Sequence, residues 1–229
     1  MQNRPKPMTT SKLSKRLVPH LRMELTELAK TDTRLCDRLG GSPNRWADNT
    51  PWPLCEYCKQ PLQFVAQLRG EADGGPVRLG TARWLQLFAC HNGGDCGFYE
   101  ARSRAHHVAL RMKPLESGLV HRPGGNTSAT VRDPLRFARE ISYVKGADDV
   151  EALEDEEDEK RSEAAYSAGF VDKLYGVPVA GNKPDTMTCT KCKKPLDFLG
   201  QLLSADDWFI YYLHVCKRGH EVTFHAHRA

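Results

Sequence analysis

The chain carries one cysteine-containing phrase twice. Residues 55–68 read CEYCKQPLQFVAQL and residues 189–202 read CTKCKKPLDFLGQL, so eight of the fourteen positions are identical. The identities include both cysteines of each Cys-x-x-Cys pair. They also include the Lys, Pro and Leu of a Lys-x-Pro-Leu turn that directly follows the second cysteine. So long a match between distant parts of one chain predicts two related folding units.

Each unit supplies four candidate metal ligands. A structural zinc site takes four Cys or His ligands in a tetrahedron, commonly one Cys-x-x-Cys turn and a second pair from elsewhere in the chain. When the two units are aligned, Cys90 of the first matches Cys216 of the second, and Cys96 falls opposite His220. We therefore predict two structural zinc sites, formed by Cys55, Cys58, Cys90 and Cys96 and by Cys189, Cys192, Cys216 and His220.

Other roles for these cysteines were weighed against zinc. A redox Cys-x-x-Cys begins a helix after a strand and needs no distant second pair, and buried reduced thiols need no pairing at all. His91 and His214 lie close enough to predicted ligands to replace one of them. Cys36 lies outside both sets, and a small buried residue is the role we expect for it.

The remaining sequence favours a β-rich α+β fold. Leu17, Leu21, Leu25 and Leu28 recur at steps of three and four, which predicts an amphipathic helix from Val18 to Lys30. Alternating apolar and polar residues predict strands in both units. The segments are LQFVAQLR, WLQLFAC and GFYEAR in the first unit, and DWFIYYLHVC and HEVTFHAH in the second.

Composition divides the chain into four parts. These are a basic N-terminal segment with the helix (1–34), the first zinc-ribbon unit (35–112), a charged linker (113–168) and the second zinc-ribbon unit (169–229). The linker contains Gly- and acid-rich stretches around a short helical pattern in DPLRFAREISYV. No apolar run is long enough for a membrane-spanning helix or a secretory signal. Cysteines that bind metal as thiolates are typical of a reducing compartment. We expect a cytoplasmic protein.

Charge lies in blocks along the chain, although the formal net charge is only +4. Residues 148–159 hold nine acids and no base. Such runs usually form solvated linkers, but this one also suits a basic partner. The candidate partner-binding residues are Glu154, Asp155, Glu156, Glu157, Asp158 and Glu159.

The order of motifs resembles that of the programmed cell death protein 2 family. The residues concerned run from RLGG-x-P through Trp and Cys-x-x-Cys-x-x-Pro-Leu to an aromatic strand with two further cysteines. The repeat of this order in the second half is similar to bacterial proteins of the YwqG type. The resemblance implies that Cys55, Cys58, Cys90 and Cys96 bind metal and that Leu39, Gly40, Gly41 and Pro43 form the loop leading into the unit. The second half departs from the pattern at Tyr175 and His220.

These features favour a protein that binds one protein partner and catalyses no reaction. The resemblance implies an escort for a new ribosomal protein or, among bacteria, an immunity protein that neutralises a toxin. Motifs for a zinc deaminase, a phosphate loop, a nucleophile elbow and a zinc protease are absent from the sequence. An alternative is nucleic-acid binding through the basic N-terminus and Arg102–Lys113. A third is an enzyme that uses the loops at the interface of the two units, where a groove could hold a small ligand.

Overall fold

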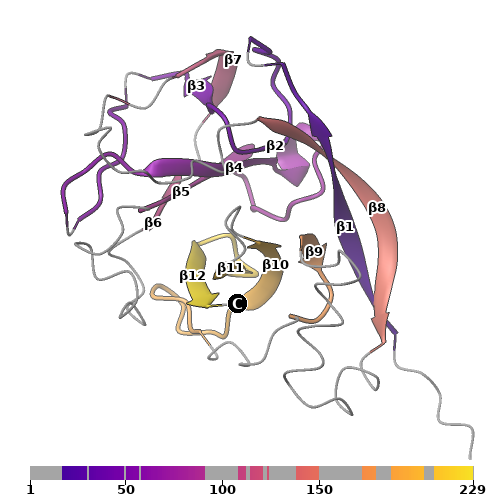
Figure 1. The fold of residues 1–229 in the computed structure, drawn as a ribbon. Helices are drawn as coiled ribbons and strands as arrows, with labels where there is room; N and C mark the ends of the chain where they lie inside the picture. The colour runs from indigo at the N-terminus through magenta and orange to yellow at the C-terminus, as the bar shows by residue number, and fades with distance from the viewer. Residues whose placement is uncertain are drawn as a thin grey trace, which may run out of the picture.

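The structure is a computed structural model that describes residues 17–29, 31–48, 50–56, 58–90, 108–111, 114–120, 123, 138–149, 172–178, 187–203 and 209–228. These residues form a curled, antiparallel ten-stranded sheet and a separate pair of strands (Figure 1). The ten strands run in the order β12-β11-β10-β9-β1-β8-β2-β4-β5-β6. The order is therefore symmetric about the neighbouring strands β1 (Leu17–Glu27) and β8 (Arg139–Asp149).

Four strands lie on each side of this central pair. On one side are β2 (Arg38–Leu39), β4 (Gln63–Arg69), β5 (Trp84–Ala89) and β6 (Val108–Arg111). On the other are β9 (Lys173–Tyr175), β10 (Asp197–Leu203), β11 (Phe209–Val215) and β12 (Val222–Arg228). The separate pair is β3 (Asn44–Trp46) and β7 (Leu115–Leu119), and a 3-10 turn spans Glu71–Asp73.

The predicted N-terminal helix is wrong, and with it the α+β fold class. The segment is the strand β1, which pairs with β8 along its whole length, and the described residues contain no helix beyond the 3-10 turn. From His20 to Thr26 polar and apolar residues alternate strictly, which is the period of a strand. The segment follows this period of two and not the helical spacing of its leucines. Leu21 and Leu25 pack on the core, whereas Leu17, assigned to the same helical stripe, is 57% exposed.

The central pair also changes the description of the predicted linker. Residues 139–149, within the segment 113–168, form β8, and β8 pairs with both β1 and β2. The short helix considered for DPLRFAREISYV is therefore wrong where the structure describes it. Together with β1, this long strand connects the two four-stranded sides of the sheet (Figure 1).

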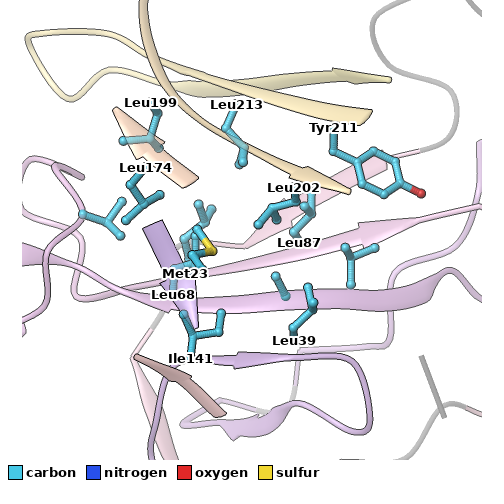
Figure 2. Packing of buried hydrophobic residues seen from close by; sticks show 14 of the residues in the cluster. Met23, Leu39, Leu68, Leu87, Ile141, Leu174, Leu199, Leu202, Tyr211 and Leu213 are labelled. Atoms are coloured by element: carbon cyan, nitrogen blue, oxygen red, sulfur yellow. The ribbon is translucent and has the colours of Figure 1, made fainter. Parts of the chain in front are cut away.

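A single hydrophobic cluster is built from both sides of the sheet. Leu68 and Leu87 come from β4 and β5, Leu202 and Leu213 from β10 and β11, and all four are at most 1% exposed. Met23 of β1 is buried in the same cluster (Figure 2). Because the curled sheet encloses these side chains, burial of both four-stranded sides stabilises one core.

The turns that lead into the two sides have matching backbones. Gly40 and Tyr175 have φ of 69° and 62°, and the glycines that follow, Gly41 and Gly176, have φ of 72° and 79°. A Cβ at Gly41 would lie 2.6 Å from the side chain of Ala138, and one at Gly176 would lie 2.1 Å from Asp148. Glycine is therefore required at the second position of each turn by conformation and by space.

Candidate metal centres

The two Cys-x-x-Cys segments adopt the same turn. The N–H of Cys55 donates to the carbonyl of Gln60 at 2.8 Å, and the N–H of Cys189 donates to that of Lys194 at 2.8 Å. Lys59 and Lys193, each directly after the second cysteine, both have φ of 57°. We call residues 55–61 with Cys90 the first knuckle, and residues 189–195 with 216–221 the second knuckle.

The following hairpins also match. The pairing of β4 with β5 shifts register between Phe64 and Ala66, and the pairing of β10 with β11 shifts between Phe198 and Gly200. Both shifts fall nine to eleven residues after the first cysteine of the phrase. The extra residue bends each hairpin, and the distal cysteine follows directly on the second strand of each pair. This geometry returns Cys90 and Cys216 to their knuckles.

Four predicted ligands meet in the second knuckle. Cys189, Cys192, Cys216 and His220 offer ligand atoms that all lie within 4.8 Å of one another. The Sγ atoms of Cys192 and Cys216 are 3.6 Å apart, and Sγ of Cys189 is 3.7 Å from Nδ1 of His220. A tetrahedral ion with bonds of about 2.3 Å to sulfur and about 2.0 Å to nitrogen separates its ligands by about 3.5 to 3.8 Å. The group could therefore hold a metal ion.

The first knuckle gathers three ligands in the same way. Cys55, Cys58 and Cys90 have Sγ atoms within 4.8 Å of one another, and those of Cys58 and Cys90 are 3.7 Å apart. The fourth predicted ligand, Cys96, lies outside the described residues. The third strand predicted at GFYEAR also lies outside them, as do the six acidic residues Glu154–Glu159.

The thiols of the second knuckle compete for ionisation. Burial opposes ionisation of Cys189, but the backbone N–H of Cys192 and the side chain of His220 outweigh burial and lower the pKa of this thiol. The pKa of Cys192 is raised instead: the N–H of Lys194 favours its thiolate, but burial and the two neighbouring cysteines outweigh that contact. Thiols this close ionise together only beside a cation, which is the chemistry of a metal site.

A carboxylate outside the ligand set joins the two turns of the second knuckle. Glu221 accepts hydrogen bonds from the backbone N–H of Thr190, at 2.9 Å, and from its hydroxyl. This contact was not predicted from the sequence, although Glu221 directly follows a predicted ligand and Thr190 lies between two others. The contact fixes the Cys-x-x-Cys turn to the His220 turn and so orients the ligands from outside.

Aromatic side chains support the first knuckle. The ring centroids of Trp52 and Phe88 lie 5.3 Å apart in an edge-on arrangement, and Trp46 packs on both rings. The indole N–H of Trp52 donates to the carbonyl of Leu62 at 2.8 Å. Cys55 and Cys90 are buried in this same cluster. The tryptophans therefore anchor the knuckle.

Of the two substitute histidines, the structure describes His214, which takes no ligand position. His214 is 5% exposed, packs edge-on against Phe198 and lies outside the ligand group. Burial lowers the pKa of His214 to about 4. His91 is outside the described residues.

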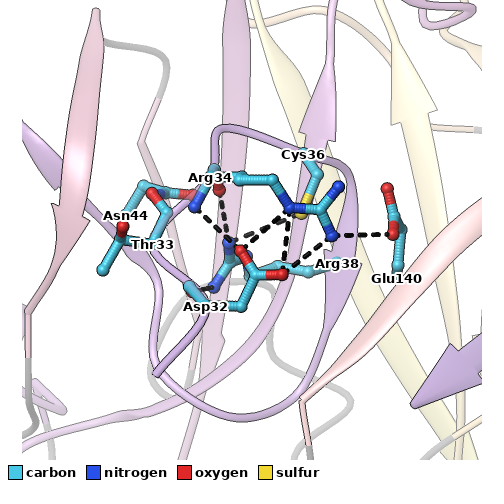
Figure 3. A network of polar contacts seen from close by, with 7 residues as sticks. All are labelled: Asp32, Thr33, Arg34, Cys36, Arg38, Asn44 and Glu140. Carbon is cyan, nitrogen blue, oxygen red and sulfur yellow. Dashed lines mark hydrogen bonds and ion pairs between the residues drawn. The ribbon is translucent and has the colours of Figure 1, made fainter. Parts of the chain in front are cut away.

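Cys36 belongs to a separate polar network (Figure 3). The thiol is buried, and an amino group of the Arg38 guanidinium lies 3.4 Å from its Sγ. Arg38, which is 1% exposed, also donates to the carbonyls of Arg34 at 2.6 Å and Ser42 at 3.2 Å. The carbonyls of the surrounding loop thus solvate a buried cation, and Cys36 packs beside it as part of the fold.

The fold and these centres define a β protein with two cysteine-rich knuckles that could hold metal ions. No family model matches the chain. Over 67 residues it is 42% identical to the mouse (Mus musculus) protein "Programmed cell death protein 2-like", a match that spans 29% of this chain and 17% of that protein. In the described part of the chain, no helix is both long and apolar enough to cross a bilayer.

Proposed function

We propose that the chain is a non-enzymatic zinc protein that holds one protein partner. The observation that carries the proposal is the second knuckle, where candidate ligand atoms from four residues lie within 4.8 Å of one another. A catalytic zinc keeps a position for water, whereas four protein ligands leave none and favour a structural ion. Three thiolates and an imidazole are the soft and borderline donors that zinc prefers.

The first knuckle holds the second zinc in this proposal. Cys96 completes its ligand set, and the matching turns and hairpins support the same ion in both places. The shared geometry, together with the eight identical positions of the repeated phrase, supports an origin of the two units by duplication. The seven cysteines of the described residues form no disulfide, which supports a reducing compartment such as the cytoplasm.

The partner in this proposal is basic. The partial similarity to the mouse protein and the resemblance of motif order support a role like that of the programmed cell death protein 2 family, an escort for a newly made ribosomal protein. The acidic residues Glu154–Glu159 supply charge complementary to such a partner. A basic toxin offers the same complementarity, and purification of the natural partner distinguishes a toxin from a ribosomal protein.

The role of zinc is tested by measuring the metal content and the captured partner in the same sample. The tagged protein, purified from its own host, is expected to carry zinc at both sites, and a strong chelator is expected to release the captured partner. Zinc binding supplies about 10 to 16 kcal/mol of folding free energy in small zinc domains, so its removal should unfold the knuckles. A chelated protein that retains its partner would show that zinc does not organise the binding surface.

The role of the acidic run in partner binding is tested separately, by removing its charge. Replacing Glu154–Glu159 with the corresponding amides keeps the length of the segment and removes six negative charges. We expect weaker capture and a flatter dependence of affinity on salt, because screened charges contribute less at high ionic strength. An unchanged affinity would assign the run to a solvated linker and leave the zinc proposal intact.

A further inference from the structure

The two knuckles share a backbone but differ in charge. In the first knuckle the exposed side chains that the structure describes are Glu56, Lys59 and Gln60, which together are neutral. In the second knuckle, the exposed side chains are five cations together with Thr190 and Pro195. The five are Lys191, Lys193, Lys194, Lys217 and Arg218.

The metal ligands bring these five cations together. Each lies within two residues of a ligand: three are on the Cys-x-x-Cys turn and two on the turn that ends at His220. The ligand atoms of the two turns lie within 4.8 Å of one another, and Glu221 joins the turns through Thr190. Two short basic runs that are more than twenty residues apart in sequence therefore form one surface, which we call the basic tip.

Among the described residues, acidic side chains form ion pairs with few of the cations of the basic tip. The described ion pairs include one with a cation of the tip, Lys217 to Asp197 at 3.4 Å, and both of its side chains are largely exposed. The carboxylate of Glu221 is directed to Thr190. Three thiolates with a bound zinc and a neutral imidazole carry a single negative charge. The cations thus outnumber the negative groups that the structure describes around them, and the knuckle holds them close together against their mutual repulsion.

The chemistry of the tip favours phosphate over a protein surface. Tight protein interfaces depend on buried aromatic or aliphatic anchors, and Pro195 is the one exposed apolar side chain on the two described turns. Contacts to phosphates need only clustered Lys and Arg side chains on a surface that positions them. We propose that the basic tip binds the phosphodiester backbone of a nucleic acid.

This surface goes beyond the proposed protein-binding role and differs from the nucleic-acid site predicted from the sequence. That prediction placed phosphate contacts at the basic N-terminus and at Arg102–Lys113, none of which belongs to the second knuckle. Only the folded second knuckle places Lys217 and Arg218 beside the lysines of the Cys-x-x-Cys turn. The tip needs none of the residues 151–160 that carry the acidic run.

The experiment measures the salt dependence of nucleic-acid binding by the metal-loaded full chain. Fluorescence anisotropy with labelled single-stranded RNA of about 20 nucleotides, from about 50 to about 200 mM salt, gives the slope of log K against log salt. Each phosphate contact contributes about 0.7 to this slope on single strands. The triple variant Lys191→Gln, Lys194→Gln, Arg218→Gln should lower the slope by about two and weaken binding at least tenfold at the lowest salt.

The first knuckle supplies the matched control. Lys59→Gln and Lys193→Gln change the same residue in the same backbone conformation, with φ of 57° at both positions. We expect Lys193→Gln to lower the slope by about 0.7 and Lys59→Gln to leave it unchanged. Zinc content is measured for every variant, so that loss of the knuckle is not mistaken for loss of charge.

Two further ligands identify what the tip binds. DNA of the same sequence should bind with the same salt slope as RNA if the phosphodiester backbone alone is recognised, and a steeper slope or tighter binding for RNA would assign the site to RNA. Labelled oligoglutamate of equal charge should bind more weakly than either. The proposal fails if oligoglutamate binds as tightly as RNA, which would indicate an acidic protein partner, or if the triple variant keeps the wild-type slope.

Discussion

Nζ of Lys173 lies 2.8 Å from both carboxylate oxygens of Asp148. Lys173 is 1% exposed and Asp148 10%, so the pair joins β9 to the end of β8 inside the protein. Burial lowers the pKa of Lys173, and the contact with Asp148 opposes that shift. Lys173 occupies the position in β9 that Arg38 occupies in β2, so both sides of the sheet bury a cation at the same place.

Removing one partner of this pair should be strongly destabilising. Asp148→Asn leaves the Lys173 ammonium buried without a counter-charge, and a broken buried pair costs about 3 to 5 kcal/mol. Asp148 also accepts the N–H of Val177 at 2.7 Å, so the turn after β9 should loosen as well. Urea unfolding of the metal-loaded protein measures the free energy of unfolding.

An exposed ion pair provides the comparison. Lys217 and Asp197 lie 3.4 Å apart with side chains 78% and 44% exposed, and Asp197→Asn should cost less than about 1 kcal/mol. Equal losses in Asp148→Asn and Asp197→Asn would show that burial of the Lys173 pair does not matter. The double variant Lys173→Met, Asp148→Leu should recover much of the stability, because it removes both charges.

Tyr175 should hold the long β4–β5 loop against the second half of the protein. Its hydroxyl donates to the carbonyl of Pro76 at 2.6 Å and accepts the N–H of Arg78 at 3.1 Å. Tyr175→Phe removes both bonds, which should cost about 1 kcal/mol, and should speed hydrogen exchange at the Arg78 amide. The amide of Tyr212, in β11 between β10 and β12, serves as the control and should keep its exchange rate. Unchanged exchange at the Arg78 amide would show that Tyr175 does not hold the β4–β5 loop in place.

Stability should fall as the pH falls below about 6.5, in part through His20. Burial lowers the pKa of His20 from its ordinary value of 6.5, although the nearby Asp148 acts in the opposite direction. Below pH 6.5 the unfolded chain therefore takes up a proton that the folded chain resists, and the free energy of unfolding decreases until the folded pKa is passed. His20→Gln removes this difference and should make the decline between about pH 7 and about pH 5.5 shallower.

The variant separates the contribution of His20 from that of a second histidine whose pKa is shifted in the same direction. The pKa of His214 is lowered to about 4, so His214 also contributes to the acid-side loss in both proteins. Zinc content is checked at each pH, because protonated ligands release metal. Parallel curves for the wild type and His20→Gln would show that His20 has the same pKa in the folded and unfolded chains.

The cysteines and the histidine that gather in the two knuckles could be predicted from sequence because their signal is local. A Cys-x-x-Cys turn fixes its own geometry, and the repeated phrase located the hairpin that returns the distal ligand. The strands β4, β5, β11 and β12 were predicted for a similar reason, since alternation within one segment reports a sheet face. These features depend on residues close together in the chain.

The N-terminal strand shows what such reasoning lacks. Leucines at steps of three and four fitted a helix, and the alternation from His20 to Thr26 fitted a strand equally well. Pairing with β8, more than a hundred residues away, and with β9 decides between them. The contact of Tyr175 with Pro76 and the pair of Lys173 with Asp148 likewise join distant segments, so no local pattern could indicate them.

Single cysteine substitutions should separate the two metal centres. Cys189→Ser should remove one equivalent of zinc and Cys55→Ser the other, because a hydroxyl does not replace a thiolate as a soft ligand. Cys36→Ser should keep both, since Cys36 lies beside Arg38 and outside the ligand groups. Metal analysis by mass spectrometry of the native protein counts the ions in each variant.

The fourth ligand of the first knuckle is tested with the same measurement. Cys96→Ser should weaken zinc binding at the first site alone, and the second site should then account for the metal that remains. The hydrogen bond from Cys55 to Gln60 closes the first knuckle, so loss of zinc there should also speed exchange at the Cys55 amide. If Cys96→Ser retains both ions at full affinity while Cys55→Ser loses one, the first site takes its fourth ligand from another residue, for which His91 is the next candidate to be substituted.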